Sequence, residues 1–100
     1  MTIAYVENLG RFVGQEVTVR GWLYNKTAKG KLYFLLVRDG GGTVQAVAFR
    51  PGVPEPAWQA CEDATQESSI IVTGLVREDK RAPGGYELSL KDVQVVQVAQ

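Results

Sequence analysis

The chain has no histidine and only one cysteine, Cys61, among its 100 residues. Without histidine the most common general base is missing, and the usual catalytic triads are missing with it. A lone cysteine excludes an internal disulfide, and it leaves too few soft ligands for a structural zinc site. We therefore expect a chain that has no catalytic residues and binds no cofactor or metal.

Long hydrophobic runs are absent as well. No uninterrupted apolar stretch approaches the roughly 20 residues that a membrane helix needs, and the chain does not open on a signal-type apolar segment. A single thiol is typical of the reducing cytosol. Hydrophobic residues make up 45% of the sequence, a normal share for a folded protein. We expect one cytoplasmic domain over residues 1–100, without membrane contact.

The net charge is zero, which argues against a protein that coats nucleic acid mainly through its phosphates. The charges are nevertheless uneven along the chain. Residues 1–50 carry seven Lys and Arg against three acids, a net charge of +4, and residues 51–100 carry four against eight, a net charge of −4. This asymmetry predicts one local surface for an anionic partner, although ordinary solvated charges are the alternative explanation.

Alternation of apolar and polar residues predicts five strands. Pro51–Pro56 begins a different element, in which Ala57, Ala60, Cys61 and Ala64 have the spacing of an amphipathic helix. Residues 1–15 read as an N-terminal arm or short helix packed on the body, and residues 25–31 as a cationic hairpin loop. The predicted strands are 16–25, 31–38, 43–49, 69–77 and 86–96.

Three strands, a helix and two further strands are the element order of a five-stranded Greek-key barrel, the OB-fold. The fold class is then all-β, with one helix between the third and fourth strands. A small barrel of the SH3 kind is the alternative, but it would lack the helix. An OB-fold presents the face of its second and third strands to an oligomer, framed by the first and fourth loops.

Single-stranded bases need an aromatic platform for stacking, groups that read base edges, and cations for the backbone. Phe34 alternates with Tyr33 and Leu35, which we expect to point inward, so its ring should project outward. Gln45 lies between Val44 and Ala46 on the adjacent strand. The periodicity alone is equally consistent with Phe34 in the core and with Gln45 bound only to water.

Several segments in order resemble the N-terminal anticodon-binding domain of class IIb aminoacyl-tRNA synthetases, which charge aspartate, asparagine and lysine. Two further segments, 65–69 and 80–88, are most similar to bacterial asparaginyl-tRNA synthetases. An aspartyl enzyme, including a non-discriminating one, is the alternative, and a free-standing OB protein that binds single-stranded nucleic acid is another. The segments that carry the resemblance are VTVRGWLY (17–24), GKLYFLLVRDG (30–40), GTVQAV (42–47), VTGLVR (72–77) and APGGYEL (82–88).

The resemblance implies that the partner is a tRNA anticodon loop, and that of tRNA-Asn in the asparaginyl case. Phe34 would then stack on the central uridine of the anticodon, Gln45 would hydrogen-bond the edge of that uridine, and Glu87 would approach the third anticodon base. The resemblance also assigns neutralisation of the loop phosphates to three cations, Arg20, Lys26 and Lys31.

The resemblance further implies a larger enzyme, whose catalytic domain would use ATP and Mg²⁺ to activate the amino acid. The chain carries none of the class II arginine motifs, so it is either an excised domain or a free-standing relative. One position departs from the pattern. Aspartyl relatives often carry an arginine in the first loop where this chain has Thr27, which disfavours the aspartyl alternative and weakens the inference for this loop.

Overall fold

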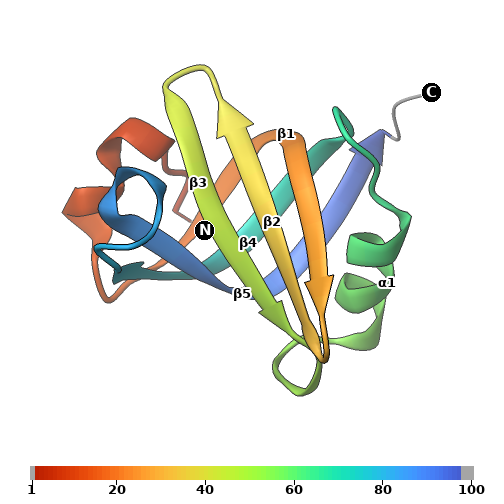
Figure 1. The fold of residues 1–100 in the computed structure, drawn as a ribbon. Coiled ribbons are helices and arrows are strands. Elements are labelled where there is room, and N and C mark those ends of the chain that lie inside the picture. The colour runs from red at the N-terminus through yellow and green to blue at the C-terminus, as the bar shows by residue number, and fades with distance from the viewer. Residues whose placement is uncertain (1, 98–100) are drawn as a thin grey trace.

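Five strands close into a barrel, and one α-helix lies between the third and fourth strands (Figure 1). The computed structural model describes residues 2–97. Strands β3 and β5 pair in parallel, whereas the other neighbouring strands are antiparallel. The predicted all-β OB-fold is therefore confirmed, and the helix distinguishes it from the SH3 alternative. The elements are η1 (Val6–Phe12), β1 (Glu16–Lys29), β2 (Leu32–Asp39), β3 (Gly42–Phe49), η2 (Arg50–Gly52), α1 (Glu55–Asp63), β4 (Ser69–Glu78), η3 (Pro83–Gly85) and β5 (Tyr86–Gln97), where η marks a 3-10 helix.

The barrel interior is filled by alternate residues of each strand. On β2, Leu35 and Val37 are fully buried, and the residues between them lie on the outer surface. Burial of each such side chain stabilises the fold by about 1.5–3 kcal/mol, which is what fixes the register of the strands. The other fully buried or nearly buried barrel residues are Val17, Val19, Leu23, Val44, Ala46, Ala48, Ile70, Val72, Val76, Leu88, Leu90 and Val93.

Two glycines allow the strands to coil tightly enough to close the barrel. A Cβ atom on Gly21 would lie 2.3 Å from the carbonyl oxygen of Arg38, and one on Gly74 would lie 2.6 Å from that of Ser89. Both contacts are with backbone atoms, which have little freedom to move. Any other residue at these positions would therefore push β1 away from β2, or β4 away from β5.

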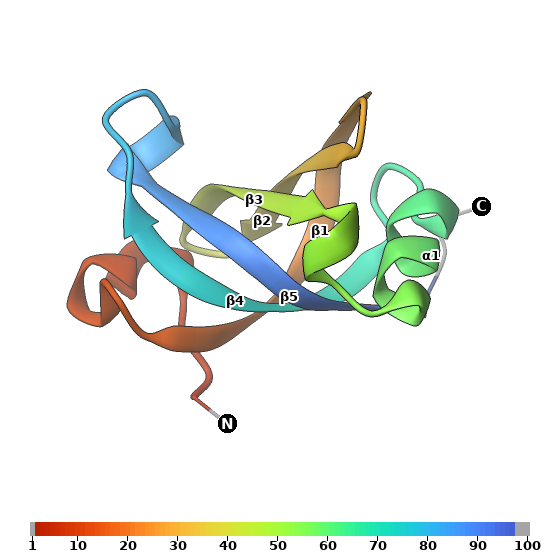
Figure 2. The same ribbon diagram turned by 90° about the horizontal axis from the view of Figure 1, so that it is seen from below.

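The two ends of the barrel are closed by different elements, η1 at one end and α1 at the other (Figure 2). At the η1 end, the buried carboxylate of Asp39 accepts hydrogen bonds from three backbone N–H groups. The Val6 N–H donates to Oδ2 at 2.8 Å, and the Gly41 and Gly42 N–H groups donate to Oδ1 at 2.8 and 3.1 Å. This one side chain thus shapes the β2–β3 turn and attaches the N-terminal segment to it.

At the other end, α1 buries Ala57, Trp58 and Cys61 against the barrel. The ring of Trp58 packs against Tyr33, with ring centroids 4.7 Å apart. Residues 55–63 include most of the segment for which the spacing predicted a helix. Figure 2 shows that α1 covers this end and leaves the outer surface of β2 and β3 open.

The first hairpin differs from its prediction. Residues 25–31 were expected to form a loop, but β1 continues to Lys29 and pairs with β2 from Trp22 to the turn. The register shifts between Leu23 and Asn25, which marks a bulge. A two-stranded arm satisfies its backbone hydrogen bonds without burying its side chains, so a polar sequence is no obstacle to strand formation here.

Candidate nucleic-acid interface

The outer surface of β2 and β3 forms a continuous patch, which we call the outer β2–β3 face and which consists of Phe34, Leu36, Gln45 and Val47. Pairing sets Phe34 opposite Val47 and Leu36 opposite Gln45. All four side chains are partly exposed, while the residues between them are buried. The structure therefore places Phe34 outside the barrel, as the alternation predicts. Phe34 and Gln45 are diagonal neighbours on this face, because their pairs lie two positions apart along the strands.

Gln45 belongs to a hydrogen-bonded chain of three side chains from three strands. The parallel β3–β5 pairing sets it opposite Glu87, and the β4–β5 pairing sets Glu87 opposite Arg77. The Gln45 Nε2 donates to Glu87 Oε2 at 3.0 Å, and the Arg77 Nη2 donates to Glu87 Oε1 at 2.6 Å. Glu87 is only 6% exposed. A carboxylate this well buried needs such partners, because burial without them is costly.

The hydrogen bond to Glu87 sets the orientation of the Gln45 side-chain amide. Because the nitrogen donates to Glu87, the carbonyl oxygen is turned away from it, and among residues 2–97 that oxygen has no hydrogen-bond partner. Glu87 accepts one bond on each oxygen, which leaves acceptor capacity on a carboxylate with about four lone-pair sites. The site therefore offers hydrogen-bond acceptors next to an aromatic ring.

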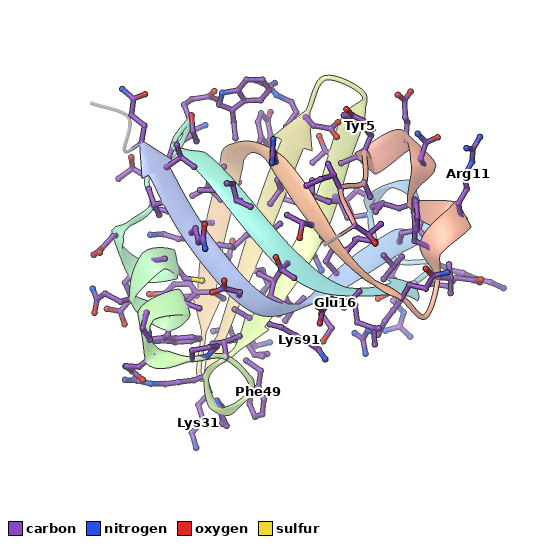
Figure 3. The ribbon with its side chains drawn as sticks, turned by 180° about the vertical axis from the view of Figure 1, so that it is seen from behind. Tyr5, Arg11, Glu16, Lys31, Phe49 and Lys91 are labelled. Carbon is purple, nitrogen blue, oxygen red and sulfur yellow. The ribbon has the colours of Figure 1, made fainter. Side chains whose placement is uncertain are left out.

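The turn between β1 and β2 and the loop between β4 and β5 border this face (Figure 1). Lys31 is exposed in that turn, and its carbonyl accepts a hydrogen bond from the Arg50 N–H at 2.9 Å. Figure 3 shows Lys31 and Phe49 at the same end of the molecule, and Leu32 pairs with Phe49. Lys31 is thus placed at the edge of the predicted interface.

Lys26 is not placed with Lys31. Its ammonium lies against the C-terminal end of α1 and donates to the carbonyl oxygens of Ala64, Cys61 and Glu62 at 2.7, 3.0 and 3.1 Å. These carbonyls end the helix without a following turn to bond them, and a cation is favoured at a helix C-terminus. Lys26 therefore holds the first hairpin to α1, and its charge is not free for a phosphate in this arrangement.

Cys61, beside Lys26, is fully buried in the core. Burial raises the pKa of the thiol to about 11, and the nearby Lys26 ammonium only partly offsets this effect. Burial likewise raises the pKa of Tyr33, and the Glu62 carboxylate adds to the increase. The thiol stays protonated near neutral pH, so it is a poor nucleophile.

Arg20 also lies apart from Phe34 and Gln45. It projects from the part of β1 that pairs with β4, opposite Ile71, and lines a shallow hollow together with Trp22 and Val96. The structure does not bring Arg20 onto the outer β2–β3 face. Of the six predicted site residues, Phe34, Gln45 and Glu87 come together, Lys31 borders them, and Arg20 and Lys26 do not join them.

Two structural features near this face had no signal strong enough to be picked out from the sequence. Arg77 ends a predicted strand, and only its pairing with β5 reveals that it holds Glu87. Tyr24 is 44% exposed and lies under the Arg38 guanidinium, whose Cζ is 5.2 Å from the ring centroid. Nothing in the sequence shows that Tyr24 and Arg38 are neighbours.

Within residues 2–97, no group of three or more His, Cys, Asp and Glu side chains is placed to hold a metal ion. Across the same residues, no helix has both the length and the apolar composition that crossing a membrane requires.

A family model described as an OB-fold nucleic acid binding domain, named for the tRNA anticodon, matches residues 17–96. An asparagine–tRNA ligase from Chloroflexus aurantiacus is 50% identical over 93 residues, which are 93% of this chain and 21% of that protein. The chain thus spans about a fifth of the length of the curated relatives that it matches.

Solved structures are similar over the whole barrel. An asparaginyl-tRNA synthetase from Pyrococcus horikoshii, complexed with asparaginyl-adenylate, has a TM-score of 0.90 and 35% identity, covering 100% of this chain and 23% of that one. An aspartyl-tRNA synthetase described as putative, from Leishmania major Friedlin, has a TM-score of 0.85 and 26% identity, covering 99% of this chain and 21% of that one. The similarity is thus greater to the asparaginyl enzyme.

Proposed function

Because this chain belongs to the family of OB-fold nucleic acid binding domains, we propose that its outer β2–β3 face binds the anticodon loop of a tRNA, and that this tRNA is tRNA-Asn. The relatives named asparagine–tRNA ligases, at 44–50% identity, support the choice of tRNA. They also support a role as the anticodon-recognition part of such a ligase. The aspartyl alternative is less well supported, because the aspartyl structure is less similar.

One observation carries the proposal, namely the Gln45–Glu87–Arg77 chain beside Phe34. The fixed Gln45 carbonyl oxygen accepts hydrogen bonds, so, when it faces the ring nitrogen of a base's pairing edge, it suits a base that carries a hydrogen on that nitrogen. Uracil has such a group at N3, whereas cytosine at N3 and adenine at N1 present an acceptor there. For a base that stacks on Phe34 and turns its edge toward Gln45, uracil is then preferred over cytosine and adenine.

Glu87 retains acceptor capacity for an amino or imino group of the neighbouring base, which we assign to the third anticodon position. Its two protein partners reduce the repulsion that a lone carboxylate would exert on the RNA backbone. Lys31 is assigned to the loop phosphates. Since Lys26 is bound to α1 and Arg20 projects elsewhere, we expect few phosphate contacts. The logarithm of the affinity should then fall only slowly with the logarithm of the salt concentration, with a slope of about −0.7 for the one contact at Lys31.

We infer that amino-acid activation with ATP and Mg²⁺ belongs to a catalytic domain of a longer ligase, and that this domain is a partner of the chain in the cytoplasm. The inference rests on the fifth of the relatives' length that the chain spans. The chain itself contributes recognition, through stacking and hydrogen bonds.

The test is an NMR titration of the chain with four anticodon stem-loops: GUU, GUC, UUU, and GUU with its central U changed to A. We expect GUU to bind most tightly and the central change to abolish the preference. Phe34→Ala should lower the affinity about 5- to 150-fold, the value of one stacked base. Gln45→Ala should equalise the central U and A, whereas Gln94→Ala, at an exposed glutamine on β5, should not. Equal binding of all four loops by the wild-type chain would refute anticodon recognition.

A further inference from the structure

A second exposed aromatic ring, that of Tyr24, lies beyond the outer β2–β3 face. Tyr24 is 44% exposed, while its neighbour Leu23 is fully buried. The β1 register shifts between Leu23 and Asn25, and such bulges commonly redirect a side chain. None of the contacts proposed above uses this ring.

The ring of Tyr24 is held by a cation on one side. The Arg38 guanidinium lies over it, with Cζ 5.2 Å from the centroid, and Arg38 Nη2 lies 3.8 Å from Glu67 Oε2. Glu67 has a φ of +71°, an unusual left-handed conformation for a residue with a side chain, and its N–H donates to the Leu23 carbonyl at 2.6 Å. The loop before β4 thus fixes the backbone of Glu67, whose carboxylate forms an ion pair with Arg38.

This arrangement is continuous with the outer β2–β3 face. Phe34, Leu36 and Arg38 alternate along the same side of β2, so the guanidinium and the ring beneath it lie on the surface that carries Phe34. Arg38 lies four positions along β2 from Phe34, which is about 13 Å at the rise of a strand. This is well beyond the roughly 3.4 Å rise of stacked bases. Phe34 and the guanidinium of Arg38 would therefore contact two separate bases of an extended strand.

We propose that Tyr24 and Arg38 form a second stacking platform, which takes a nucleotide flanking the bases read at Phe34 and Gln45. This proposal rests on the proposed function. Every base has a π-face, so such a platform accepts any base, and an arginine plane stacks on bases as an aromatic ring does. Because Glu67 balances the charge of Arg38, the platform binds the base rather than its phosphate.

The charges around the ring favour a nucleotide over an apolar protein segment. Arg38 and Glu67 are each about half exposed at their side chains, 47% and 52%, so a charged pair borders the platform. An apolar partner would have to desolvate both groups, whereas a base leaves their outer edges in water. A base can also donate an amino hydrogen to the Glu67 carboxylate.

The test uses the trinucleotide GUU, the same trinucleotide with two adenosines on its 5′ side, and with two on its 3′ side. Binding of each RNA is followed by NMR with the wild-type chain, Tyr24→Ala and Tyr24→Phe. One of the two extensions is expected to tighten binding by about fivefold or more. It should also shift the Tyr24 ring protons upfield, which a purely structural role of Tyr24 would not do.

The gain from the extension should vanish in Tyr24→Ala and persist in Tyr24→Phe, while binding of GUU itself stays within about twofold in both. Tyr5→Ala is the matched control, because it removes a ring that is 60% exposed on the N-terminal segment (Figure 3), and it should keep the gain. The gain should also be the same at low and moderate salt, since no phosphate contact is involved.

Two outcomes would overturn the platform while leaving the proposed function intact: GUU binds in a Phe34-dependent manner but neither extension adds affinity, or the gain survives in Tyr24→Ala. In either case the surface around Tyr24 would be a contact surface for a protein and not for RNA. If GUU does not bind at all, or binds equally to Phe34→Ala, the proposed function fails and the platform fails with it.

Discussion

Lys26 was expected from the sequence to contact phosphates, but the structure places its ammonium on three carbonyl oxygens at the end of α1, at 2.7–3.1 Å. Replacing it by methionine keeps most of the aliphatic stem and removes the charge. We predict that Lys26→Met lowers the free energy of unfolding and leaves RNA affinity nearly unchanged. The two readouts separate a structural role from a direct contact with RNA.

The expected loss follows from the bonds that disappear. Hydrogen bonds to a charged group contribute about 1.5–3 kcal/mol, and a cation at a helix C-terminus adds about 0.3–1 kcal/mol. Three bonds from one ammonium are not additive, and water reaches the carbonyls of the variant. We therefore expect a loss of about 2 kcal/mol, which in a domain of this size lowers Tm by roughly 8–16 °C.

The assay is urea unfolding followed by tryptophan fluorescence, with Lys29→Met as the matched control. Lys29 is exposed on the same hairpin, and its replacement should change stability by less than about 0.5 kcal/mol. The reasoning would be refuted if Lys26→Met unfolded like the wild-type chain. If instead the slope of log affinity against log salt became about 0.7 shallower in this variant, Lys26 would contact a phosphate, as the resemblance implies.

Three further predictions concern buried polar groups. Asp39→Asn should cost about 1–3 kcal/mol, because an amide cannot accept from both directions; faster hydrogen exchange at the Val6 amide would locate the loss. Arg77→Met should cost about 1–2 kcal/mol, because Glu87 stays buried with one partner fewer. Adding Glu87→Gln should recover part of that loss in urea titrations. Because the pKa of Cys61 is raised from 9.0 to about 11 on folding, the unfolded thiol loses its proton first as the pH rises. The contribution of this thiol to stability should therefore be constant below about pH 9 and fall as the pH rises from 9 to 11, and Cys61→Ala should remove this component of the fall.

The strands of the barrel follow from the sequence because the interior accepts only apolar side chains at every second position. The alternation along 16–25 and 31–38 therefore predicts both the strands and their inner faces. The end of β1 did not follow, since residues 25–29 form a strand whose backbone is satisfied by β2 and whose side chains need no core. In residues 25–29, polar side chains indicate exposure to solvent and not a loop.

Alternation also predicted Phe34 and Gln45 as outward residues, and it did so correctly. It could not show which side of a closed barrel an outward residue faces, and Arg20 is outward on the side of β4. Alternation also could not predict contacts between residues that are distant in the sequence. Lys26 meets carbonyls 35 to 38 positions away, and Arg77 meets Glu87 across a hairpin.

The use of charge in this domain fits the proposal that a neutral chain binds RNA selectively and weakly. At least five of its eleven cations are engaged by the protein itself, and two of these, Lys26 and Arg38, lie on β1 and β2. In the proposed function, recognition relies on stacking and oriented hydrogen bonds, which distinguish bases, more than on phosphate contacts, which do not. Weak affinity at this site is no handicap if a second contact on the same tRNA raises the effective concentration, and a short selective contact then decides which tRNA stays bound. The engaged cations are Lys26, Arg38, Arg50, Arg77 and Lys91.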